Sequence, residues 1–103
     1  MPPLSATVAD DELSVTACFS VHAHAEPGVM PRVLELFAKR GLIPSAWHSA
    51  VRGTDQAELT IDIQMTGLGR DLMDYIAACL RQLAYVEVVL TSEKRGACGR
   101  SEF

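Results

Sequence analysis

The chain has 103 residues, and 49% of them are hydrophobic. This length is enough for one domain with a core and too short for several domains. Its formal net charge is −4, and its lysines and arginines form no cluster that would neutralise a phosphate backbone, so nucleic acid is not an expected partner. No apolar run approaches the roughly 20 residues that span a bilayer, so no membrane association is expected either.

The start of the chain predicts a flexible acidic lead-in over residues 1–13, because it holds an acidic run at 10–12 and shows no hydrophobic period. This stretch lacks the basic start and the apolar run of a secretory signal. We therefore expect a cytoplasmic protein.

A strand, a tight turn and a helix are predicted for residues 14–41. Apolar and polar residues alternate over 15–24, which is typical of a strand with one buried face. Residues 26–28 then predict a turn, and apolar residues at helical spacing predict a helix over 29–40 that stops at Gly41. A strand that passes through a turn into a helix leaves free backbone N–H groups at the helix start, and these attract carboxylates. We therefore place any small-ligand site at this turn.

Two strands joined by a hairpin are expected next. Residues 42–52 are rich in small and β-compatible residues, and Pro44, which has no backbone N–H, indicates an edge strand. Residues 53–55 predict a turn, and residues 56–65 alternate cleanly between apolar and polar side chains.

The last predicted elements are a helix over 70–83, a strand over 85–90 and a flexible polar tail over 92–103. The element order is therefore β-α-β-β-α-β. Two right-handed crossovers interleaved in this way give an α+β ferredoxin-like sandwich, in which a four-stranded antiparallel sheet carries two helices on one face. The first and third strands then lie at the centre of the sheet and the second at an edge.

Over residues 14–91 the chain resembles an ACT domain, the small regulatory module of amino-acid metabolism, and most closely the small regulatory subunit of acetolactate synthase. The resemblance is closest in four short stretches: EPGV at 26–29, FAKRG at 37–41, TIDI at 60–63 and VEVV at 86–89. It implies a non-enzymatic homodimer, joined edge to edge, that binds an amino acid or a similar small carboxylate at the interface. It also implies a regulated partner, which is the catalytic subunit of an amino-acid biosynthetic enzyme such as acetolactate synthase, in the synthesis of branched-chain amino acids.

The predicted ligand-binding residues surround the first turn and the start of the second strand: Ala25, Glu26, Pro27, Gly28, Val29, Met30, Ile43 and Pro44. Gly28, with the amides of Val29 and Met30, is expected to receive a ligand carboxylate, because glycine allows close approach and the helix dipole favours an anion. The alternative is a turn with no ligand. Ala25 and Ile43 stand where the resembled family often has Asn, so a structural oligomerisation module that has lost ligand binding remains the second hypothesis.

His22 and His24 lie two residues apart on the polar face of the first strand, with side chains about 7 Å apart along it. Asp62 and Gln64 on the neighbouring strand add oxygen atoms. No third histidine or cysteine has a convincing spacing, so we favour a solvated or partner-facing polar sheet face over a metal site. An enzyme or metal binder that uses His22, His24 and Asp62 on this open face is the remaining alternative.

Trp47 and His48 are neighbours on the predicted edge strand, so one of them points toward the helices and the other away. Trp47 is the sole tryptophan. An amphipathic ring near a sheet edge either fills a gap in the core or anchors a dimer, and we favour the dimer anchor.

Neither an enzyme nor a cofactor-binding protein is predicted. The sequence lacks a Ser-His-Asp or Cys-His arrangement, a phosphate loop and a paired-carboxylate pattern. Cys18, Cys79 and Cys98 are far apart and form no C-x-x-C pair, so neither a disulfide framework nor a zinc site is indicated. We therefore expect reduced thiols, no metal and no cofactor.

Overall fold

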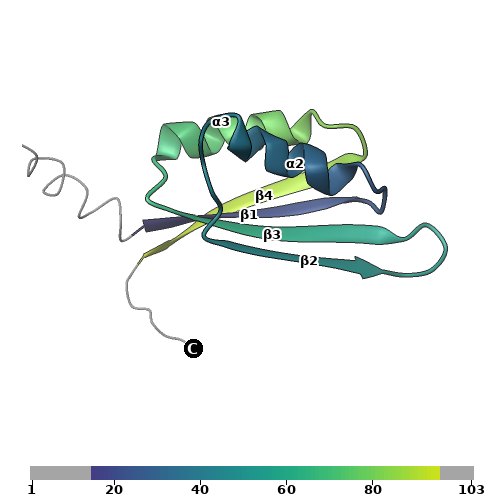
Figure 1. Cartoon of the computed structure of the whole chain (residues 1–103). Coiled ribbons are helices and arrows are strands. Elements are labelled where there is room, and N and C mark those ends of the chain that lie inside the picture. The colour runs from purple at the N-terminus through teal and green to yellow at the C-terminus, as the bar shows by residue number, and fades with distance from the viewer. Residues whose placement is uncertain (1–14, 96–103) are drawn as a thin grey trace, which may run out of the picture.

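The computed structural model of the protein describes residues 15–95, and it contains six elements in the predicted order (Figure 1). They are β1 (Val15–His24), α2 (Val29–Ala38), β2 (Ala46–Arg52), β3 (Glu58–Thr66), α3 (Arg70–Arg81) and β4 (Val86–Arg95). The strand order in the antiparallel sheet is β2-β3-β1-β4, and both helices lie on one face (Figure 1). The ferredoxin-like fold is therefore confirmed, with β1 and β3 at the centre and β2 at an edge. The predicted lead-in, most of the predicted tail and Cys98 lie outside the described residues.

The core lies between the sheet and the two helices. On β1 and β3 the predicted alternation holds, and the inward side chains of Phe19, Ile61 and Ile63 are at most 1% exposed. The rings of Phe19 and Phe37 meet edge to face with centroids 5.7 Å apart, which fixes α2 against the central strand. Among residues 15–95, no helix covers the other face of the sheet (Figure 1).

The second strand begins later than predicted. β2 starts at Ala46, because the chain is still closing the end of α2 at Leu42, whose N–H returns to the Phe37 carbonyl (2.9 Å). Contact with β3 begins at Ser45, whose N–H bonds the Gln64 carbonyl (2.7 Å). Pro44 therefore precedes the strand. A backward bond of this kind closes a helix end, and it delays the extended backbone.

The last strand is longer than predicted. Instead of ending at Leu90, β4 continues to Arg95, and its last residues pair with the start of β1 from Cys18↔Ser92 to Val15↔Arg95. Residues 92–95 therefore belong to the sheet and not to the predicted tail. These residues are polar, so hydrophobic alternation does not reveal a strand that is held by pairing with a distant segment.

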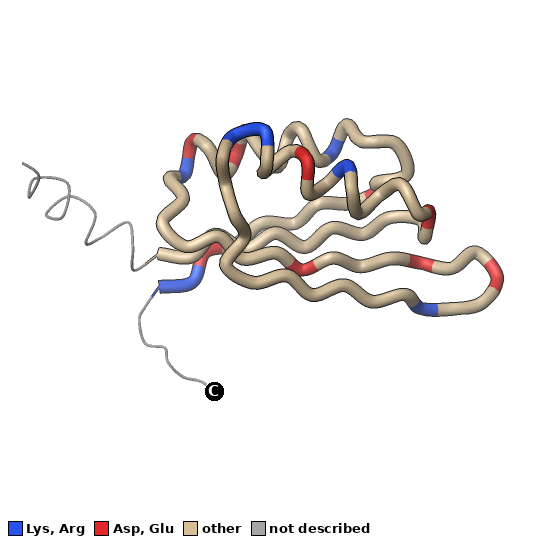
Figure 2. Tube along the Cα trace, in the orientation of Figure 1, with Lys and Arg blue, Asp and Glu red and all other residues tan. Residues whose placement is uncertain are grey.

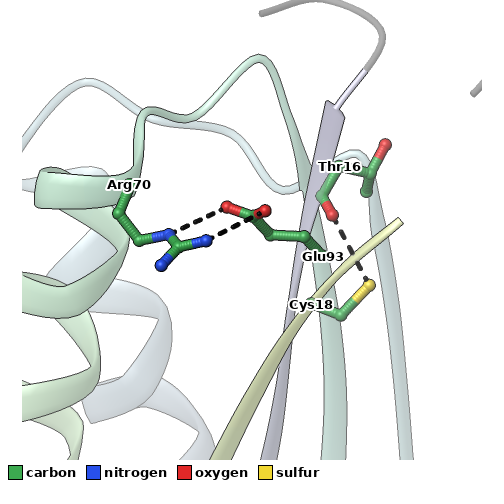
Figure 3. A network of polar contacts seen from close by, with 4 residues as sticks. All are labelled: Thr16, Cys18, Arg70 and Glu93. Carbon is green, nitrogen blue, oxygen red and sulfur yellow. Dashed lines mark hydrogen bonds and ion pairs between the residues drawn. The ribbon is translucent and has the colours of Figure 1, made fainter. Parts of the chain in front are cut away.

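An ion pair joins the start of α3 to β4 (Figure 3). Arg70 Nε and Nη2 donate to the two carboxylate oxygens of Glu93 at 3.1 and 3.3 Å. This bidentate contact lowers the pKa of Glu93, chiefly through the hydrogen bonds from Arg70. No helix in the described part of the chain is long and apolar enough to cross a membrane.

Candidate functional site

An open hollow of about 370 Å³ lies beside the turn between β1 and α2. The turn lines one side of it and the β2–β3 hairpin the other: Ala25, Glu26, Pro27, Met30, Val51, Ala57 and Leu59. A hydrogen bond from the Ala25 N–H to the Ala57 carbonyl (3.0 Å) holds the two sides together. Four predicted ligand-binding residues thus share this hollow with three hairpin residues that the sequence analysis missed, because alternation does not show which hairpin positions face the turn.

The backbone of the turn determines which amides a ligand can reach. The Val29 N–H already donates to the Glu26 carbonyl at 3.1 Å, so this amide, which was expected to receive a ligand carboxylate, is engaged within the turn. The N–H groups of Gly28 and Met30 have no partner within residues 15–95. They are the amides that remain at the start of α2, where the helix dipole favours an anion.

Two charged side chains flank this turn. Glu26 is exposed and lines the hollow, and the Arg32 guanidinium lies beside Gly28, since a Cβ at position 28 would be 3.2 Å from Arg32 Nη1. The sequence analysis did not assign Arg32 to the site. The position of Arg32 could have indicated this, because it follows Gly28 by about one helical turn and so lies on the same side of the helix start.

The remaining predicted residues lie away from this hollow. Ile43 and Pro44 follow the other end of α2, a helix of ten residues whose length is about 15 Å. Ile43 is 85% exposed, the highest value among the exposed large hydrophobic residues of the described part of the chain. Within one chain, the structure does not bring Ile43 and Pro44 to the turn.

The two histidines of β1 have separate partners. His24 Nε2 lies 2.9 Å from the Glu87 carboxylate, and His22 Nε2 lies 3.2 Å from the Ser20 hydroxyl. Within residues 15–95, no three His, Cys, Asp or Glu side chains gather closely enough to hold a metal ion. The same open face has a hollow of about 480 Å³ over β4, β1 and β3, beside Cys18, whose thiol points to the Thr16 carbonyl (Figure 3).

β2 is at one edge of the sheet. Which of its backbone N–H and C=O groups point outward follows from the pairing of β1, β3 and β2. The His24 N–H bonds the Tyr85 carbonyl, so even-numbered residues of β1 direct their backbone groups to β4 and odd-numbered ones to β3. The backbone groups of Val21 therefore point toward Ile61 on β3, and those of Ile61 point back toward β1. Ser49 lies opposite Ile61 on β2, so its N–H and C=O point away from β3, to the outside of the sheet.

By the same alternation Trp47 and Val51 also present backbone N–H and C=O groups at this edge. Their side chains lie on the helix side of the sheet, where Trp47 is partly buried and packs against the core. β2 carries no lysine, arginine, aspartate or glutamate before its last residue, Arg52 (Figure 2). No described strand pairs with the outer side of β2, and this edge lacks the charges that usually protect one.

The structure is a small β-α-β-β-α-β domain with a hollow beside the turn between β1 and α2. A family model described as the ACT-like domain matches residues 10–96, and the chain belongs to this family. ACT-like domains are in general small regulatory domains without catalysis of their own, and they typically bind small ligands and often dimerise. Comparison with curated proteins gives no match.

Two solved structures show the same fold. The C-terminal domain of the MgtC protein from Mycobacterium tuberculosis is similar with a TM-score of 0.60 and 17% identity, over 88% of this chain and 99% of that chain. The ACT domain from GTP pyrophosphokinase of Chlorobium tepidum is similar with a TM-score of 0.58 and 13% identity, over 75% of this chain and 96% of that chain.

Proposed function

We propose that this domain is a regulatory sensor that forms a homodimer through its β2 edges and binds an amino acid, or a similar small carboxylate, in the hollow beside the β1–α2 turn. The observation that carries the proposal is the composition of this hollow. Glu26 and an apolar hairpin wall line the hollow, and two free amides and the Arg32 guanidinium lie beside it at the start of α2.

These three features match the three parts of an amino acid. The N–H groups of Gly28 and Met30 and the guanidinium of Arg32 suit a ligand carboxylate. Glu26 suits a ligand ammonium group. The apolar hairpin wall, with Val51 and Leu59, suits an aliphatic side chain. An inorganic anion would use only the first of these features.

The unpaired backbone groups of β2 support an antiparallel dimer with its two-fold axis at Ser49. This residue is the middle of β2, so a copy paired about it uses the whole strand and places Trp47 opposite Val51 of the second copy. An axis at His48 would instead place two imidazoles opposite each other. The Ser49 register also brings a tryptophan next to a residue that lines the hollow.

This register accounts for the two predicted site residues that lie at the far end of α2. Because the paired strands run in opposite directions, the start of one β2 lies beside the end of the other, close to Val51 and the hollow. Pro44 and Ile43 of the second copy, which precede β2, then approach the ligand. The 85% exposure of Ile43 is the expected state of an interface residue seen in one chain.

The regulated partner in this proposal is the cytoplasmic catalytic subunit of an amino-acid biosynthetic enzyme such as acetolactate synthase. The support is the sequence resemblance at 26–29 and 37–41 together with membership of a regulatory domain family. The test is the activity of a purified acetolactate synthase catalytic subunit with and without this chain. A change in activity that an added amino acid reverses supports the assignment. No change in activity when this chain is in large excess over the catalytic subunit contradicts it.

The ligand is tested by thermal-shift screening of the full chain against the common amino acids. A ligand that binds only the folded state stabilises it by mass action. At a ligand concentration of 100 times Kd, the free energy of unfolding rises by about 2.7 kcal/mol, and Tm rises with it. We expect one chemical class to raise Tm. No shift from any amino acid would favour the structural oligomerisation module, a hypothesis supported by Ala25, whose apolar side chain lines the hollow where the resembled family often has Asn.

A further inference from the structure

At the other edge of the sheet, with which no described strand pairs, the apolar middle of β4 favours pairing with another strand. The charged residues of β4 stand toward its two ends: Glu87, Glu93, Lys94 and Arg95. β4 is ten residues long, and its side chains Val88 and Leu90 on the open face are 44% and 57% exposed. A long edge with exposed apolar residues is a template for a strand of a second molecule. If β2 and β4 both paired, copies would join without end and not as a closed dimer.

The backbone of β4 at Val89 points to this free edge. Even-numbered residues of β1 bond toward β4, as the His24 N–H bond to Tyr85 shows, and Val89 lies opposite Val21, an odd-numbered residue. The pair Val21↔Val89 is therefore not hydrogen-bonded, and the Val89 N–H and C=O point away from β1. An approaching strand would need this carbonyl as an acceptor.

A side chain from α3 already occupies that carbonyl. Arg81, the last residue of α3, donates from Nη2 to the Val89 oxygen at 2.8 Å. This is a charge-assisted hydrogen bond to the middle of the edge, and it places a guanidinium where the neighbouring strand would lie. Within the described residues, no side chain from outside the sheet bonds a backbone group of β2.

We propose that Arg81 closes the β4 edge and so directs self-association to β2. The role in directing association to β2 rests on the proposed dimer. The bond from Arg81 to the β4 edge lies within one chain and does not depend on the dimer. Pairing at β4 would require the guanidinium to leave the Val89 oxygen, and a cation on the edge also disfavours a second edge that carries the same cation.

The test is Arg81→Ala in the full chain, with mass measured by sedimentation velocity over a concentration series. We expect the average mass of this variant to exceed that of the parent by about twofold or more at the highest concentration, since β4 edges then pair. The matched control is Arg40→Ala, just after the end of α2, which also removes an arginine bond to a carbonyl, here that of Leu36 (3.4 Å), together with a contact on the Tyr75 ring. The control should keep the parent mass.

A second variant separates this inference from the proposed dimer. Ser49→Pro removes an outward N–H of β2 and should be a monomer, whereas Ser49→Pro with Arg81→Ala should regain a dimer through β4. If the parent is itself a monomer, the β2 dimer fails, but Arg81→Ala should still raise the mass. A folded Arg81→Ala protein, with the circular dichroism of the parent, that keeps the parent mass in both backgrounds overturns the inference.

Discussion

Gly28 has a backbone conformation that any residue can adopt. Its φ is −80°, whereas Gly41 and Gly53 have φ of +69° and +82°, in the left-handed region that favours glycine. A Cβ at position 28 would meet only the far end of the Arg32 side chain, which can move aside. A side chain at this position therefore tests the ligand site without straining the turn.

Gly28→Asp is expected to abolish ligand binding while the domain stays folded. The added carboxylate repels a ligand carboxylate, fills the space beside the free amides and offers Arg32 a competing partner. The measurement is isothermal calorimetry with the amino acid found by screening, together with Tm. Binding as tight as in the parent would show that the site is not at this turn.

Gly69→Asp is the matched control for this variant. Gly69 also precedes a helix, has φ −71° and has nothing within 4 Å of an added Cβ. It lies before α3, away from the hollow, and Asp is a favourable residue at a helix start. We expect unchanged ligand affinity and an equal or slightly higher Tm, so a loss of affinity here would point to an unspecific charge effect.

At the scale of elements, α2 is held to the sheet by one buried stripe. Its buried side chains are Val29, Val33 and Phe37, and Phe37 is 0% exposed and stacks edge to face on Phe19. Leu34 on the same helix is 47% exposed. The stripe fixes the helix start beside the hairpin, so the packing of α2 also sets the geometry of the hollow beside the β1–α2 turn.

Phe37→Ala should lower the free energy of unfolding by about 3–5 kcal/mol, because it removes a buried ring and leaves a cavity. Leu34→Ala, on the exposed face, should lower it by less than about 1 kcal/mol. Urea unfolding followed by circular dichroism measures both. Equal losses in the two variants would mean that α2 does not dock through Phe37.

The β2 edge gives a prediction of its own at this scale. Ser49→Pro should convert the dimer to a monomer, because proline lacks the N–H at the centre of the proposed pairing and still fits an edge strand. Light scattering at micromolar concentration measures the mass. Ser49→Ala, which changes the same side chain but keeps the backbone N–H, is the matched control and should leave the mass unaltered.

For the whole molecule, the Arg70–Glu93 pair predicts how stability depends on pH. The hydrogen bonds from Arg70 lower the pKa of Glu93 from its ordinary value of 4.5 in the folded state. The stabilisation from this pair is therefore present above that value and is lost as pH falls through the lower folded-state pKa. Acid denaturation of the parent should include this loss.

Glu93→Gln should be less stable than the parent at neutral pH, and the difference should shrink below pH 4.5, the ordinary value for the group. Arg70→Gln should give the same pattern, since either change removes the pair. Urea unfolding at several pH values measures both variants. A stability difference that stays constant down to the acid limit would show that the pair does not couple folding to this proton.

The sequence by itself determined the six elements, their order and the ferredoxin-like sandwich. These follow from alternation and helical spacing, which are local properties of a chain with a single core. It also predicted a ligand site at the turn after β1, because amides left free at a helix start follow from the local order of strand, turn and helix. The position of β2 at an edge followed from Pro44 and from the crossovers.

Only the tertiary structure decided which side chains meet. It showed that Val29 is already bonded, that Arg32 lies beside Gly28, and that residues 92–95 extend β4. It also set Val51, Ala57 and Leu59 against the turn, and Arg81 against Val89. The physical reason is that these contacts join segments far apart in the chain, and their geometry depends on strand register and helix docking, which no local pattern contains.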